Sequence, residues 1–113
     1  MDQDQVEKLS IAYQKLQGQL QTLSMQKEQF NIQKEELKEA HAEVEKARGK
    51  VYVTIGGIIV ETAKEEAIKN IADKQELLSL RLNIVTKQHE ETARKEKELR
   101  EQISAMLKEQ GNQ

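Results

Sequence analysis

Residues 49–62 read GKVYVTIGGIIVET and differ from everything on either side of them. Two runs rich in β-branched residues flank Gly56 and Gly57, which suit a two-residue turn whose backbone needs positive φ. The stretch therefore predicts a single β-hairpin over residues 50–62. The cross-strand pairs fixed by that turn are Ile55 with Ile58, Val53 with Val60, and Val51 with Thr62.

The predicted hairpin needs a cover that its own chain does not supply. An isolated two-stranded sheet is marginal in water, and both of its edges are open to further pairing. Helices that run away from it cannot cover it fully. We therefore expect an obligate oligomer in which hairpins of several subunits close a β-barrel. The residues expected to make that contact are Val51, Tyr52, Val53, Ile55, Ile58, Ile59 and Val60.

A seven-residue repeat of apolar side chains precedes the hairpin and predicts a helix over residues 4–48. Such a repeat presents a continuous apolar stripe and demands a partner helix. Its d positions are Leu9, Leu16, Leu23, Phe30, Leu37 and Val44. Its a positions are Val6, Tyr13, Leu20, Lys27, Lys34 and His41.

A second helix is predicted over residues 63–110, and its length matches that of the first. The two should pair antiparallel, with positions whose numbers sum to about 112 facing each other, given the equal rise per residue. Leu77, Leu80 and Ile84 lie off the seam and suggest packing against something beyond the intramolecular partner. The a and d positions of this helix are Ile68, Ile71, Gln75, Leu78, Leu82, Val85, His89, Thr92, Glu96, Leu99, Ile103 and Met106.

The ends of the predicted helices carry recognisable signals. Arg48 suits a last turn and Gly49 suits a left-handed residue after it. Thr62 and Glu65 have the spacing of a capping box. On the second helix, the i,i+4 pairs expected to support the polar part of the seam are Glu90 with Arg94, Glu91 with Lys95, and Glu96 with Arg100.

Composition narrows the class of protein. The 113 residues include no proline and no cysteine, the aromatic content is 3% and the formal net charge is −2. Such a chain fills a thin seam between helices and not a thick core, so a single domain over residues 1–113 with a mainly α fold is expected. The absence of a basic excess, of a long apolar run and of a signal peptide predicts a cytoplasmic protein that binds neither nucleic acid nor membrane.

Neither catalysis nor a bound cofactor is indicated. No nucleophile and base are paired at a useful spacing, and Gly56-Gly57 lies between strands and not before a helix that would hold phosphate. His41 and His89 both fall at a positions, but antiparallel pairing places them far apart. They are better explained as tolerated seam residues, so we expect no enzyme activity, no metal site and no cofactor.

The arrangement of helix, single hairpin and helix resembles a prefoldin β-type subunit over nearly the whole chain. The segment Val51–Val60 is similar to the family pattern Val-Tyr-x-x-Val-Gly-x-Leu/Ile-Ile/Leu-Val, and Gly-Gly-Ile-Ile-Val-Glu resembles the eukaryotic subunit 2 version. The resemblance implies an ATP-independent co-chaperone in which two α-type and four β-type subunits join their hairpins in a double β-barrel. It also implies that the coiled coils hold non-native proteins at their distal ends and pass them to a group II chaperonin.

Two functions remain open on the sequence. Under the resemblance, apolar residues near the arm ends would hold unfolded client proteins, because exposed apolar groups near a fraying end suit varied partners. Ile11, Met25 and Ile32 add apolar surface at f positions. The alternative is a structural coiled-coil adaptor that tethers folded partners. The residues expected to bind clients are Val6, Leu9, Tyr13, Ile103, Met106 and Leu107.

Overall fold

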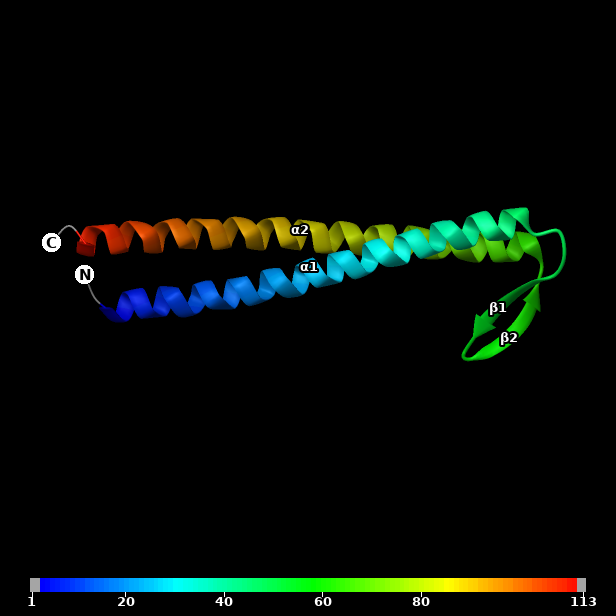
Figure 1. Cartoon of the computed structure of the whole chain (residues 1–113), viewed down its shortest axis with the longest axis horizontal. Helices are drawn as coiled ribbons and strands as arrows, with labels where there is room; N and C mark the ends of the chain where they lie inside the picture. The colour runs from blue at the N-terminus through cyan, green and yellow to red at the C-terminus, as the bar shows by residue number, and fades with distance from the viewer. Residues whose placement is uncertain (1–2, 112–113) are drawn as a thin grey trace. The chain divides into compact units, whose positions relative to one another are not determined.

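The computed structural model describes residues 3–111 as two long helices joined by one antiparallel hairpin (Figure 1). The elements follow in the order α1 (Gln3–Lys46), β1 (Val51–Ile55), β2 (Ile58–Thr62) and α2 (Lys64–Gly111). The mainly α, helix–hairpin–helix fold expected from the sequence is confirmed.

The chain divides into two compact units, and both helices run through both of them. One unit combines residues 28–83 and contains the hairpin; we call it the hairpin unit. The other combines the start of α1, up to Lys27, with α2 from Ile84 onwards; we call it the terminal unit. Each is described separately below.

The hairpin has the predicted register. Val51 pairs with Thr62, Val53 with Val60 and Ile55 with Ile58. Gly56 and Gly57 have φ values of 55° and 81°, in the left-handed region that a two-residue hairpin turn requires and that glycine adopts without a steric penalty. The Gly-Gly pair therefore fixes which side chains share a face of the sheet.

Within the hairpin unit, the base of the hairpin packs against the helices. Val51 is 8% exposed and Ala67, early in α2, is 2% exposed. Val51 and Val53 line a common groove with Leu37 and Val44 of α1 and with Ala67. The helices do not cover the hairpin as far as the turn, and Ile55 and Ile58 beside the turn are exposed.

The heptad seam is borne out in both units. All six d positions of α1 are half-buried, and α2 buries Leu78 in the hairpin unit and Val85 in the terminal unit. Lys34 departs from the pattern, since its a position is exposed. In the terminal unit Ser24 Oγ lies 3.0 Å from His89 Nε2. That contact puts the antiparallel register within one residue of the predicted one.

The predicted glycine cap of α1 is wrong. The helix ends at Lys46, and Gly49 does not have a positive φ. The Ala47 N–H donates to the Val44 carbonyl at 3.1 Å. This bond spans three residues, so the last turn is tighter than an α-helical turn, whose bonds span four. The Lys64 ammonium then donates to the Glu45 carbonyl, so a side chain from α2 satisfies the helix end that glycine was expected to cap.

The predicted capping box of α2 is also wrong. The helix begins at Lys64, so Ala63 takes the N-cap position and Thr62 stays in β2 opposite Val51. Thr62 Oγ1 donates to the Ala63 carbonyl at 3.5 Å and does not accept from the first turn. Strand pairing has overridden the local capping signal. The Glu91–Lys95 and Glu96–Arg100 ion pairs form as expected, at 3.6 and 3.7 Å.

Candidate functional site

The hairpin presents a large apolar surface to solvent on both of its faces. Of the seven residues predicted to join subunits, only Val51, the first residue of β1, is buried. Val53 is half-buried. Ile59 on the opposite face is the most exposed of the group, at 72%. We call the exposed members the hairpin surface: Tyr52, Ile55, Ile58, Ile59 and Val60.

The backbone of the hairpin also offers groups that a partner strand could bind. The sheet has two strands in the order β1–β2, so each strand keeps one edge whose N–H and C=O groups have no strand partner within residues 3–111. An exposed apolar surface with unpaired edges is the geometry that adds further strands. The one ion pair across the sheet, Lys50 with Glu61 at 3.9 Å, is exposed and contributes little.

The residues predicted to bind clients lie mostly in the seam of the terminal unit. Val6, Leu9, Tyr13 and Ile103 are half-buried, and Met106 is 8% exposed. Only Leu107 presents its side chain outward, at 52% exposure. In the closed coiled coil Leu107 is thus the accessible member, and Met106 becomes accessible only when the two helices separate.

Tyr13 forms a polar contact that sequence reasoning missed. Its hydroxyl hydrogen-bonds the Glu96 carboxylate, which raises the pKa of Tyr13 above its ordinary value of 10.0; Arg100 acts in the opposite direction. Gln17 Nε2 donates to the same hydroxyl at 3.1 Å. The signal was present in the sequence, since Tyr13 and Glu96 occupy seam positions of helices that run antiparallel. This contact ties the two helices of the terminal unit together.

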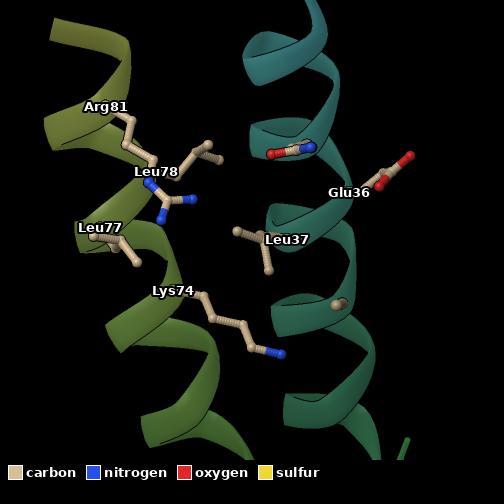
Figure 2. A pocket seen from close by; sticks show the side chains of 8 residues that line it. Glu36, Leu37, Lys74, Leu77, Leu78 and Arg81 are labelled. Carbon is tan, nitrogen blue, oxygen red and sulfur yellow. The ribbon is translucent and has the colours of Figure 1, made fainter. Parts of the chain in front are cut away.

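A second apolar feature lies on the flank of the hairpin unit, in a groove of ≈ 410 Å³ between α1 and α2. Figure 2 shows Leu37 of α1 and Leu78 of α2 facing each other across its floor. Lys74 and Arg81 extend from α2 beside Leu77, while Glu36 points outward from α1 (Figure 2). We call this the flank groove.

The two histidines are engaged separately. His89 contacts Ser24, and His41 Nδ1 lies 3.6 Å from Glu45 Oε1. Across residues 3–111, no three His, Cys, Asp or Glu side chains are gathered where they would hold a metal ion. None of the helices in the described part of the chain is long and apolar enough to span a membrane.

Comparison with known proteins identifies the family. Residues 7–110 match the family model described as prefoldin subunit. The chain belongs to the prefoldin subunit family. This is a family of chaperones without enzymatic activity, and the resemblance inferred from the hairpin is confirmed.

Curated relatives of this chain include several prefoldin beta subunits. The chain is 40% identical over 57 residues to prefoldin subunit beta of Methanosarcina barkeri, with 50% of this chain and 49% of the relative covered. It is 41% identical over 59 residues to prefoldin subunit beta of Pyrococcus abyssi, with 52% and 50% covered. The matched segments thus span about half the length of the curated relatives.

Solved structures extend the similarity to most of the chain. The prefoldin beta subunit of Thermococcus strain KS-1 is 34% identical, with a TM-score of 0.84 over 91% of this chain and 92% of that one. The prefoldin beta2 subunit of the same strain shares the fold, at 22% identity and a TM-score of 0.54 over 85% of this chain and 97% of that one.

Proposed function

We propose that this chain is a β-type subunit of an ATP-independent co-chaperone, which assembles through its hairpin and holds non-native proteins at the ends of its coiled-coil arms. The observation that carries the proposal is the hairpin surface. Five large apolar side chains on a two-stranded sheet stay exposed, although the helices of the same unit bury the base of that sheet.

Burial of the hairpin surface supplies the driving force for assembly. Apolar area removed from water contributes about 25 cal/mol per Å². Pairing of the open strand edges with hairpins of neighbouring subunits satisfies their backbone groups at the same time. The proposed assembly is a hetero-oligomer of four such chains with two prefoldin α-type subunits, joined in a β-barrel.

Weak contacts at several arm ends would then act together on one client. Linking several weak sites raises the overall affinity for a flexible chain without a strong individual site. Leu107 is the exposed apolar group in this part of the terminal unit, and the seam residues Val6, Leu9 and Met106 lie close by in sequence or across the coil. Release to a group II chaperonin completes the proposed cycle, with no nucleotide consumed by this chain.

The test is suppression of aggregation. The assembled protein, with its α-type partner, is added to an unrelated chemically denatured protein as the denaturant is diluted, without ATP, and light scattering is followed. Protection of several unrelated substrates is the expected result. Protection of none, by an oligomer of full size, would favour the adaptor that tethers folded partners.

A further inference from the structure

We propose that the flank groove binds an amphipathic helix of a partner protein, one that carries carboxylates beside its apolar face. The apolar side chains of that helix lie on the leucines of the groove, and Lys74 and Arg81 bind its carboxylates. This contact is additional to the chaperone cycle and depends neither on assembly through the hairpin nor on client binding at the arm ends.

The first observation is the apolar floor of the groove. Leu37 of α1 and Leu78 of α2 line it, together with the small side chain of Ala40. Leu77 also lines the groove and is 48% exposed, although the neighbouring Leu78 is the residue that is buried in the seam. A groove between two helices that presents leucines and a small residue is a surface on which the apolar face of a third helix packs.

The second observation is the charge over this floor. Lys74 and Arg81 extend from α2 toward α1, one on either side of the level of Leu37, while Glu36 is directed away from the groove (Figure 2). Within residues 3–111 the side chains of Lys74 and Arg81 take part in no ion pair. The groove is therefore positively charged, in a chain whose formal net charge is −2.

The third observation is that α2 supplies no carboxylate to these two cations. Its other interior cations each have an Asp or Glu three or four residues away, the spacing of a helical ion pair: Lys69, Lys87, Arg94, Lys95, Lys97 and Arg100. The residues at those distances from Lys74 and Arg81 are uncharged: Asn70, Ile71, Leu77, Leu78, Ile84 and Val85. The charges of Lys74 and Arg81 thus remain available to an anion from outside the helix.

The spacing of the two cations favours a helix as the occupant. Lys74 and Arg81 lie two turns apart on α2, which is about 10.5 Å at a rise of about 1.5 Å per residue. Two carboxylates two turns apart on a partner helix have the same separation and share a face, and the apolar residues of the turn between them lie over Leu37 and Leu77. An extended chain covers that distance in about three residues, which puts the two side chains on opposite faces.

A designed peptide tests this chemistry. The probe is an alanine-based peptide of about 15 residues, the length at which such a helix begins to form in water, with two Glu residues two turns apart, leucines between them and a fluorophore at one end. Its binding to the full-length chain is followed by fluorescence anisotropy at low salt. The control peptides replace both Glu by Gln, move both Glu to the opposite face of the helix, or place a proline in the middle.

Two double variants of the chain remove the same total charge at different places. Lys74→Gln with Arg81→Gln removes the cations of the groove. The matched control, Lys69→Gln with Lys87→Gln, changes exposed positions on α2 that do not line the groove. We expect the first variant to bind the Glu peptide about tenfold more weakly, the effect of two partly screened ion pairs, and the second to bind it as the parent chain does. Circular dichroism and native mass establish that each variant keeps its fold and its assembly.

The expected result is binding of the Glu peptide in preference to all three controls, weakened by added salt and by Leu77→Ala. No binding of the Glu peptide to the folded chain would overturn the site. Equal affinity of the Gln peptide, or of the peptide with Glu on the opposite face, would overturn recognition of charge. Equal affinity of the proline peptide would overturn a helical occupant.

The location of the site has its own outcomes. An equal loss of affinity in the Lys69→Gln, Lys87→Gln variant would show that the peptide does not bind in the groove. If added α-type chains prevent the peptide from binding, the groove is a subunit contact and the separate partner is ruled out. None of these results alters assembly through the hairpin or protection of clients, which are measured separately.

Discussion

The ammonium of Lys64 donates a hydrogen bond to the backbone carbonyl of Glu45 at 2.7 Å and another to that of Ala47 at 3.3 Å. Lys64 is the first residue of α2, and Glu45 lies in the last turn of α1. One side chain therefore joins the two helices across the base of the hairpin. It also places a positive charge at the end of α1, where the helix dipole is negative.

Replacing Lys64 should therefore weaken the base of the hairpin unit. Lys64→Met keeps most of the apolar stem but removes both hydrogen bonds, and we expect the free energy of unfolding to fall by about 1 kcal/mol. Urea denaturation at one fixed chain concentration measures this, because oligomer stability depends on concentration. Lys69→Met, at an exposed position on the same helix, is the control and should change little. Equal effects of the two substitutions would show that Lys64 has no capping role.

The same glycine-to-alanine change should have opposite effects at two positions. Gly57 has a φ of 81°, so Gly57→Ala forces a side chain into the left-handed region and should destabilise by about 1–2 kcal/mol. Gly18 lies within α1, and apart from its chain neighbours and the local helix backbone no atom lies within 4 Å of where a Cβ would stand. Gly18→Ala should stabilise the protein by about 1 kcal/mol, because alanine favours the helix. Thermal unfolding of both variants decides the matter, and a Gly57→Ala variant that is no less stable than the parent chain would disprove the two-residue turn.

The Tyr13 hydroxyl should lose its proton at a higher pH than an ordinary tyrosine does. The Glu96 carboxylate accepts a hydrogen bond from the phenol and repels the phenolate, so the pKa of Tyr13 lies above 10.0 in the folded chain. Because the folded pKa is raised, the stability that this contact contributes is present below about pH 10 and is lost as the pH rises through the folded pKa. Absorbance of the phenolate in a Tyr52→Phe variant, which leaves Tyr13 as the one tyrosine, measures the midpoint. A midpoint at or below 10.0, with the helices still formed, would rule out the contact.

Much of the fold followed from short-range pattern. The Gly56-Gly57 pair and the alternation around it determine the hairpin register, because a slip of one residue would exchange the two faces. The seven-residue repeat likewise determined the seam, and Ser24 opposite His89 lies within one residue of the predicted alignment. The helix ends were not predictable in this way. Thr62 carried a capping signal that strand pairing with Val51 overrode, and the Lys64 cap depends on where the chain returns after the hairpin.

In the candidate site, too, some features follow from the sequence pattern and others depend on tertiary packing. The exposure of Leu107 could be anticipated from its place off the seam, and that of Tyr52 and Ile59 from their face of the hairpin, which is opposite to that of Val51. The burial of Val51 could not, because it depends on Ala67 and the helices folding over the base of the sheet. Nor could the pattern indicate how far Met106 is enclosed. That burial arises from packing in the terminal unit.

Assembly should depend on the hairpin surface and not on exposed apolar residues in general. Val60 is exposed in the single chain, so Val60→Asp should cost the isolated fold little, whereas an unpaired charge buried between subunits costs several kcal/mol. We expect the oligomer to dissociate while circular dichroism keeps its helical signal. Ile11→Asp, at an exposed site on α1, is the matched control and should leave assembly intact. If the Val60→Asp variant still sediments at the size of the intact oligomer, assembly through the hairpin is contradicted.

Client capture at the arm ends is tested most directly by deleting residues 1–10 together with 104–113. The deletion removes Leu107 and Met106 but leaves the hairpin surface and most of the seam in place. Sedimentation first establishes that the truncated protein has full oligomeric size, and suppression of aggregation of a denatured protein is then measured without ATP. A steep loss of protection is predicted, because each arm loses its exposed contact and the loss multiplies over several arms. Undiminished protection would contradict the account and move client binding to another surface of the arms.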